Sequence, residues 1–242
     1  MINIVFISYQ FPPENVGGAQ RPFKFVKYLR EFGINPIVVK LSPESFEEVY
    51  ENFMFDESFM NELPQETSII DVRSKKLINK SDGKLQSFLR FFFKITDPRA
   101  KGWRPYFLPA IDKIINEYSP KAIFVTVPPF SVTPLAEKVS RKHKLPLIID
   151  MRDAWSGWGV SPLPSYIHYY LIKRLEKRML KAARKIVVTS DQTLLDLQNM
   201  YSTLDKGNMH VITNGYDKEI DRWILPQVNI NEKFIIGYVG SF

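Results

Sequence analysis

Two adjacent glycines, Gly17 and Gly18, stand between the first apolar segment of the chain and a helical pattern. Glycine has no Cβ atom, so backbone N–H groups at such a turn approach an anion closely, and the dipole of the following helix adds partial positive charge. A phosphate or diphosphate suits this arrangement, although the spacing matches neither the GxGxxG fingerprint nor a P-loop. The alternative interpretation is a tight turn in which the glycines only permit the backbone path.

A second polar group follows the apolar segment that ends at Asp150, and it contains Asp150, Arg152, Asp153 and Trp155. Two carboxylates and a guanidinium are suited to hydrogen-bonding sugar hydroxyls, and an indole ring is suited to stacking on a sugar ring. The alternative interpretation is an Arg–Asp ion pair that only orders the loop. Both interpretations can hold at once.

Two shorter polar pairs also follow apolar segments. Asn214-Gly215 is typical of a turn, because both residues tolerate positive φ, and we expect a turn here. Thr189-Ser190 is compatible with a helix cap or with a ligand contact. The chain has no cysteine, which excludes disulfides, thiolate metal sites and a cysteine nucleophile. No metal site is predicted, because the three histidines lie far apart in the sequence: His143, His168 and His210.

The elements that must position these residues are short apolar runs, most of them rich in Ile and Val and without period-two alternation. This pattern is typical of parallel strands covered on both faces. Helical patterns separate the runs, and one spans Arg21–Glu31, with Phe25, Leu29 and Phe32 on one face and Gly33 as its stop. The alternation predicts an α/β fold with a doubly wound parallel sheet, whose ligands bind beyond the carboxyl ends of the strands. The predicted strands are Ile2–Ser8, Pro36–Lys40, Ser68–Val72, Ala122–Val127, Leu147–Asp150, Lys185–Thr189 and Met209–Thr213.

The chain has 242 residues, 45% of them hydrophobic, and a formal net charge of +7, which favours an anionic partner. Much of this charge lies in the segment Lys84–Phe107, where aromatic and basic residues alternate. This composition is suited to anionic lipid headgroups, and the alternative is an ordinary helix core with a solvated basic face. Within it, the residues predicted to face a membrane are Phe88, Arg90, Phe91, Phe92 and Lys94, and Trp103, Tyr106 and Phe107 are expected to add aromatic surface.

A second basic stretch, Tyr166–Lys185, has the spacing of a packing helix through Leu171, Leu175 and Met179. No apolar run is long enough to cross a bilayer and no basic signal-peptide start is present, so we expect a cytoplasmic protein. Nucleic acid is not an expected partner, because no recognition-helix, zinc-finger or RNP pattern occurs. The last residues read as a buried strand and a glycine turn, and we therefore expect the sequence to be a piece of a longer protein.

Taken in order, the motifs resemble the amino-terminal half of a GT-B glycosyltransferase of family 4, nearest to the bacterial members that build capsule, O-antigen and exopolysaccharide. The resemblance implies a Rossmann-like, acceptor-side domain over 1–225, followed by a linker and the first strand of a carboxyl-terminal, donor-binding domain over 226–242. The motifs that carry the resemblance are Phe11-Pro-Pro with Gly17-Gly18, Thr126-Val-Pro-Pro129, the Asp-x-Arg-Asp-x-Trp segment at 150–155, Asn214-Gly-Tyr-Asp217 and the closing Gly237-Tyr-Val-Gly-Ser241.

The resemblance also implies a function: transfer of a sugar, with retention of configuration and without a metal or other cofactor. The donor is a nucleotide-sugar held mainly by the second domain, and the acceptor is a lipid-linked or membrane-associated saccharide, which would place the protein on the inner face of the cell membrane. The family's Glu-x7-Glu motif lies beyond residue 242, so this chain is expected to be inactive alone. The implied roles are donor-diphosphate binding for Gly17 and Gly18, catalytic contacts near the transferred sugar for Asp150, Arg152 and Asp153, and acceptor or cleft contacts for Arg21, Trp155, Asn214 and Gly215.

Two other functions stay open from the sequence. One is a membrane-surface or protein-interaction module that uses an α/β scaffold without chemistry, which the basic aromatic segment favours. The other is a nucleotide-sugar epimerase of GT-B architecture.

Overall fold

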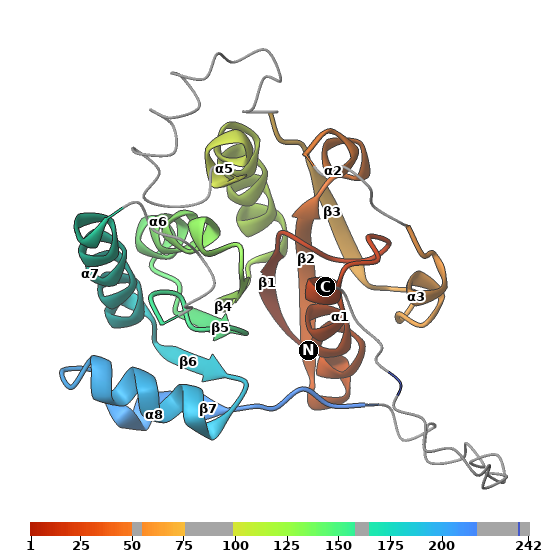
Figure 1. Ribbon diagram of the computed structural model, residues 1–242. Helices are drawn as coiled ribbons and strands as arrows, with labels where there is room; N and C mark the ends of the chain where they lie inside the picture. Colours follow the sequence, from red (N-terminus) through yellow and green to blue (C-terminus); the bar gives the residue numbers. More distant parts are fainter. Residues whose placement is uncertain (50–54, 76–98, 158–164, 217–236, 238–242) are drawn as a thin grey trace, which may run out of the picture.

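The computed structural model describes residues 1–49, 55–75, 99–157, 165–216 and 237. Seven parallel strands form one sheet in the order β3-β2-β1-β4-β5-β6-β7 (Figure 1). The strand order reverses between β1 and β4, and a reversal of this kind opens a crevice at the carboxyl ends of the strands in a doubly wound sheet. The predicted fold class is confirmed. The strands are β1 (Ile2–Ser8), β2 (Ile34–Leu41), β3 (Ser68–Val72), β4 (Ala122–Val127), β5 (Leu147–Met151), β6 (Lys185–Val188) and β7 (Met209–Val211).

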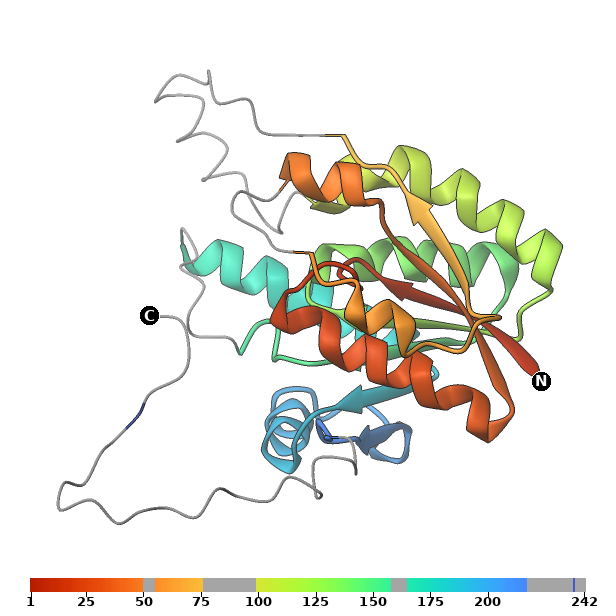
Figure 2. The same ribbon diagram turned by 90° about the vertical axis from the view of Figure 1, so that its right-hand side faces the viewer.

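Helices cover both faces of the sheet. Buried side chains of α1 and half-buried ones of α3 belong to one apolar cluster, and side chains of α5, α6, α7 and α8 belong to the cluster on the opposite face. Figure 2 shows α5 and α1 on opposite sides of the strands. The helices are α1 (Gly17–Leu29), η1 (Arg30–Phe32), α2 (Pro43–Val49), α3 (Ser58–Asn61), α5 (Arg99–Tyr118), η2 (Phe130–Val132), α6 (Thr133–His143), α7 (Tyr166–Ala182), α8 (Asp191–Met200) and η3 (Lys206–Asn208).

Helix α1 packs on the sheet through a wider stripe than the one that the sequence predicts, and the predicted Phe25 and Leu29 pack against the core cluster of this face. The buried apolar residues of the helix are Ala19, Pro22, Phe23 and Val26, spaced three and four apart as one helical face requires. Phe32, which was expected on the packed face, is 77% exposed. Phe32 lies in η1, beyond the end of α1 at Leu29, so the helical face does not extend to it.

The aromatic residues at the start of α5 belong to the core and not to the surface. Trp103 and Phe107 are fully buried, and the Trp103 Nε1–H donates to the Val72 carbonyl oxygen at 3.1 Å. The expectation that both add aromatic surface is therefore wrong, because this turn of α5 faces the sheet; Tyr106 alone of the three is exposed. The other residues predicted to face a membrane, Phe88, Arg90, Phe91, Phe92 and Lys94, lie outside the described residues.

A buried ion pair fixes the loop that connects β1 to α1. The Lys40 ammonium of β2 lies 2.8 Å from the Glu14 carboxylate, and both side chains are almost completely buried. The other carboxylate oxygen of Glu14 accepts from the Phe11 N–H at 3.1 Å. Burial raises the pKa of the Glu14 carboxyl, and the neighbouring Lys40 opposes that rise. The loop that carries the two glycines is thereby attached to the second strand.

We expect Lys40→Met to lower the free energy of unfolding by about 3–5 kcal/mol, because it leaves a buried carboxylate without a cation. Glu14→Gln combined with Lys40→Met removes both charges and is expected to recover most of that loss. Urea denaturation of the single and double variants measures both values. A double variant as unstable as Lys40→Met would contradict the assignment of the loss to an unpaired charge.

Candidate functional site

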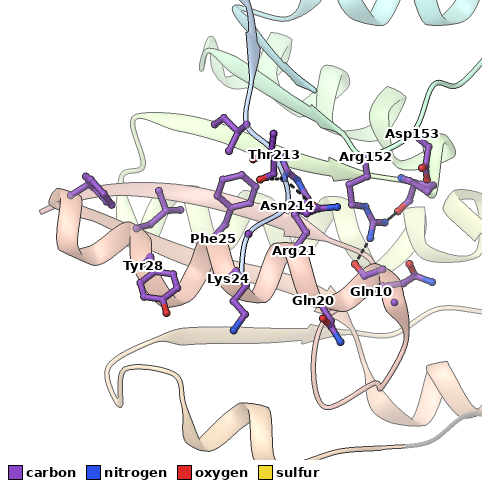
Figure 3. Close-up of a pocket in the computed structure, with 17 residues that line it drawn as sticks. Gln10, Gln20, Arg21, Lys24, Phe25, Tyr28, Arg152, Asp153, Thr213 and Asn214 are labelled. Carbon is purple, nitrogen blue, oxygen red and sulfur yellow. Dashed lines mark hydrogen bonds between the residues drawn. The ribbon is translucent and has the colours of Figure 1, made fainter. Parts of the chain in front are cut away.

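A pocket of about 800 Å³ lies at the reversal of the strand order, between α1 and the segments that follow β1, β4, β5 and β7 (Figure 3). Its polar end is formed at the carboxyl ends of the strands, and its other end runs along the outward side of α1 beside Ile212. Polar lining residues are Gln10, Gly17, Gly18, Gln20, Arg21, Lys24, Arg152, Asp153, Thr213, Asn214 and Gly215, and apolar ones are Phe25, Tyr28, Leu29, Phe32, Pro128 and Ile212.

A buried ion pair between Arg21 of α1 and Asp150 of β5 forms the floor of this region. The Arg21 Nη2–H donates to an Asp150 carboxylate oxygen at 2.8 Å, and its Nε–H lies 3.1 Å from both carboxylate oxygens. The Thr126 hydroxyl of β4 donates to the same carboxylate at 2.8 Å. Asp150 is 0% exposed and does not line the pocket. The expectation that it contacts a ligand in the cleft is therefore corrected, because its carboxylate is paired with Arg21 and Thr126 inside the protein.

The Arg152 guanidinium connects the loop after β5 to the start of α1 and to the end of β4. It donates to the carbonyl oxygens of Gly18, Val127 and Pro128. In a regular helix the Gly18 carbonyl would accept from the N–H of residue 22, but residue 22 is a proline and has no N–H. Arg152 supplies the missing donor, so a residue after β5 completes the first turns of α1.

Gly18 is necessary for this contact, and Gly17 is not. A Cβ atom built on Gly18 would lie 2.6 Å from the Arg152 Nη1 atom and 2.2 Å from the Gln10 Oε1 atom. A Cβ atom on Gly17 would meet nothing within 4 Å. Gly18 therefore fits the interpretation that a glycine permits the backbone path, because it allows close packing. Gly17 stays compatible with anion binding, because its backbone is open to the pocket.

Asp153 is the carboxylate after β5 that reaches the pocket, where it is exposed beside Arg152. The structure places Trp155 outside this pocket. Its ring stacks on Phe130 with 5.1 Å between centroids and 4° between planes. One face of the indole is therefore occupied by a protein ring.

Glu176, which the sequence analysis missed, holds the loop after β5 from below. Its carboxylate, 1% exposed, accepts from the N–H groups of Trp155 and Ser156 at 3.3 and 3.2 Å and from the Tyr201 hydroxyl at 2.6 Å. Burial, and next the Glu176 charge, raise the pKa of Tyr201, so the phenol stays a donor. A single acidic residue within the apolar stripe of a helix is the sequence signal that marks such a buried acceptor.

The two shorter polar pairs have different outcomes. The Ser190 hydroxyl accepts from the Thr193 N–H at 3.2 Å, which confirms a helix cap, and the Thr189 hydroxyl donates to the Arg152 carbonyl oxygen at 3.0 Å. The expected turn at Asn214-Gly215 is wrong, because residues 212–216 are irregular without a turn and Gly33 is the glycine with positive φ in the described chain. Arg21 accounts for this path: its Nη1–H groups donate to the Thr213 carbonyl oxygen and the Asn214 Oδ1 atom at 3.2 and 3.1 Å.

The chemistry available in the pocket is anion and hydroxyl binding. Helix α1 begins at Gly17 after Val16, which makes no side-chain cap, and its first turn has no acidic residue. Gly17 and Gly18 of this turn line the polar end, where the helix dipole places partial positive charge. Asp153 is a hydroxyl acceptor and Lys24 a cation on the lining. Among the residues that the structure describes, no cluster of His, Asp and Glu is arranged to hold a metal ion. No described helix has the length and apolarity needed to span a bilayer.

The sequence matches the profile of glycosyltransferase family 4 over residues 16–220. The chain belongs to this family. No curated protein sequence matches it significantly. The matched range contains every pocket-lining residue except Gln10.

Solved structures show the same fold for this family 4 chain at low sequence identity. A sucrose-phosphate synthase from Thermosynechococcus elongatus is 15% identical with a TM-score of 0.53, and 90% of this chain covers 49% of that one. Anabaena Alr3699/HepE in complex with UDP-glucose is 13% identical with a TM-score of 0.52, covering 90% of this chain and 45% of that one. A UDP-glucosyltransferase from Polygonum tinctorium is 13% identical with a TM-score of 0.51, covering 92% of this chain and 55% of that one. The chain spans about half the length of these proteins, and the predicted half of a GT-B fold is confirmed.

The burial of Asp150 and the exposure of Asp153 give a matched pair of substitutions. We expect Asp150→Asn to lower the free energy of unfolding by about 3–5 kcal/mol, because the buried Arg21 charge loses its partner. Asp153→Asn is the same chemical change at an exposed position three residues later. It is expected to change the free energy of unfolding by less than about 0.5 kcal/mol. Urea denaturation compares the two, and equal losses would disprove the division of the carboxylates into floor and lining.

Proposed function

We propose that this chain is the acceptor-side half of a retaining glycosyltransferase that transfers a sugar from a nucleotide-sugar to a lipid-linked or membrane-associated saccharide in surface polysaccharide biosynthesis. The observation that supports this most directly is the pocket at the strand-order reversal, which joins the open N-terminus of α1 to the Asp153 carboxylate. Membership of glycosyltransferase family 4 supports the reaction class. Anabaena Alr3699/HepE, of similar fold, is in complex with UDP-glucose, which supports a nucleotide-sugar donor.

The donor diphosphate is proposed to bind at the start of α1. Gly17 leaves open space where a side chain would project, and the uncapped N–H groups of the first turn together with the helix dipole favour an anion there. Lys24 lies on the same lining and adds positive charge. Arg21 contributes less, because the Asp150 carboxylate neutralises its charge.

Asp153 is proposed to accept hydrogen bonds from sugar hydroxyls rather than to act as a general base. It stands at the polar end of the pocket, where its carboxylate reaches a ligand without disturbing the floor. Arg152 and Asp150 serve as positioning residues in this scheme, since their hydrogen bonds go to the protein itself. Trp155 is proposed to support the loop through Phe130.

The proposal keeps the domain boundary at residue 225, with 226–242 as the linker and first strand of a donor-binding half. This boundary lies outside the described residues. The 242-residue chain alone is accordingly expected to be inactive, and the protein that includes the donor-binding half to be active.

The decisive assay supplies that two-domain protein with a set of nucleotide-sugars and a pool of lipid-linked acceptors and measures transfer. We expect transfer from one donor, with Asp153→Asn lowering kcat/KM on the order of tenfold or more through lost hydroxyl contacts while the thermal midpoint stays unchanged. Transfer unaffected by Asp153→Asn would remove Asp153 from the site. Interconversion of the nucleotide-sugar without transfer would replace the proposed function by an epimerase.

The phosphate assignment is tested at Gly17 with side chains of increasing size. Gly17→Ala and then Gly17→Val are expected to lower kcat/KM for the donor progressively, because each side chain enters the space next to the uncapped N–H groups. Differential scanning calorimetry is expected to find nearly unchanged thermal midpoints, since a Cβ atom at Gly17 meets no other atom within 4 Å. Unchanged donor kinetics in both variants would favour the tight-turn interpretation.

A further inference from the structure

Helix α7 presents large apolar side chains to solvent at its N-terminal end. Tyr166, Ile167 and Tyr170 are 92%, 69% and 62% exposed. Leu171, which the sequence predicts to be packed, is also exposed, because α7 packs through Ile172, Met179 and their neighbours. Three aromatic or branched aliphatic residues within five positions are thus turned away from the core.

The same outward stripe becomes cationic toward the C-terminal end of α7. Spacings of three and four residues place Arg174, Arg178 and Lys181 in line with Ile167 and Tyr170, and all three basic residues are exposed. The acidic residue of the helix, Glu176, points inward and is buried. From the neighbouring α6, Glu137 faces Arg178 at 3.2 Å, so one of the cations is partly neutralised.

The position of this stripe relates it to the pocket. Helix α7 follows β5, so it begins at the carboxyl ends of the strands, the end at which the polar part of the pocket opens. Figure 2 shows the start of α7 at that end of the molecule, and Figure 1 shows the helix at its outer edge beside α6. Helix α5 begins at the same end and carries exposed Lys101, Arg104 and Tyr106 on its first turns.

We propose that the outward face of α7 docks on an anionic membrane surface, with Tyr166, Ile167 and Tyr170 in the interfacial region and Arg174 and Lys181 against lipid headgroups. Amphipathic helices bind membranes through buried apolar area plus attraction of basic residues to anionic lipids, and tyrosine is favoured at the interface. A protein partner of equal area would need shape complementarity, whereas a basic stripe next to exposed aromatic residues is sufficient for a lipid surface. The docking would bring the carboxyl ends of the strands, where α7 begins, toward the membrane that carries the proposed acceptor. It thereby deepens the proposed function, but it is measured without sugar transfer, so either can fail alone.

The test is co-sedimentation of the 242-residue chain with vesicles of phosphatidylcholine alone or mixed with phosphatidylglycerol. We expect binding to the mixed vesicles, weakened by salt, and little binding to phosphatidylcholine alone. The triple variant Tyr166→Ser, Ile167→Ser, Tyr170→Ser is expected to have a partition constant for the mixed vesicles that is lower on the order of tenfold. Arg174→Ser with Lys181→Ser is expected to reduce it by about 25-fold, from roughly fivefold for each of the two charges removed.

Matched controls change equally exposed residues elsewhere on the chain. Phe32→Ser with Leu195→Ser removes exposed apolar groups from η1 and α8, and Lys113→Ser with Lys206→Ser removes exposed charges from α5 and η3; both pairs are expected to bind like the parent chain. The thermal midpoint of each variant confirms that it is folded. Failure of the parent chain to bind phosphatidylglycerol vesicles, or equal losses in the control and α7 variants, would overturn the proposal.

Discussion

The pocket depends on one buried charge pair, that of Arg21 and Asp150. Removing two charges from water is costly, and the cost is offset only when each charge is fully hydrogen-bonded. Asp150 meets this condition through Arg21 and the Thr126 hydroxyl, and Arg21 through Asp150, the Thr213 carbonyl and Asn214. The pair therefore fixes α1 against β5, and Arg21 also holds the segment after β7. Three segments that line the pocket, those of α1, β5 and β7, are thus held by the same side chain.

A second arginine, Arg152, connects the same region through backbone carbonyl oxygens. Successive residues of β5 point to opposite faces, so Asp150 faces α1 and Met151 enters the core on the other side. Arg152 then spans the end of the sheet to the Gly18 carbonyl, which Pro22 leaves without a helical donor. A proline in the middle of a helix, a glycine without a side chain and an arginine more than a hundred residues away thus form one structural unit. The proline by itself would leave a helix carbonyl without a donor, and the arginine replaces that donor.

The sequence predicts the sheet well because the strands are buried on both faces, and fully buried runs of Ile and Val are conspicuous. It predicts helix faces less well. Phe32 and Leu171 were expected in the core and are exposed. Phe32 lies beyond the end of α1, and α7 has apolar residues on two sides, of which only tertiary packing selects one. The sequence brings Asp150, Arg152 and Asp153 into one loop but does not separate their roles. That separation comes from partners such as Arg21 and Gly18, at sequence distances over which no local pattern extends.

The use of charge within the pocket follows from these partners. The Asp150 carboxylate neutralises the Arg21 guanidinium, and the Arg152 guanidinium donates to protein carbonyl oxygens, so both arginines give shape to the site. The start of α1 at Gly17 and the Lys24 ammonium contribute positive charge to the lining, and Asp153 contributes a carboxylate. Partial charges at one helix end stabilise an anion by only about 0.3–1 kcal/mol at an exposed site. If the proposed diphosphate binds here, a helix end of this strength orients it without holding it tightly, and most of the donor's binding energy has to come from the second half of the proposed transferase.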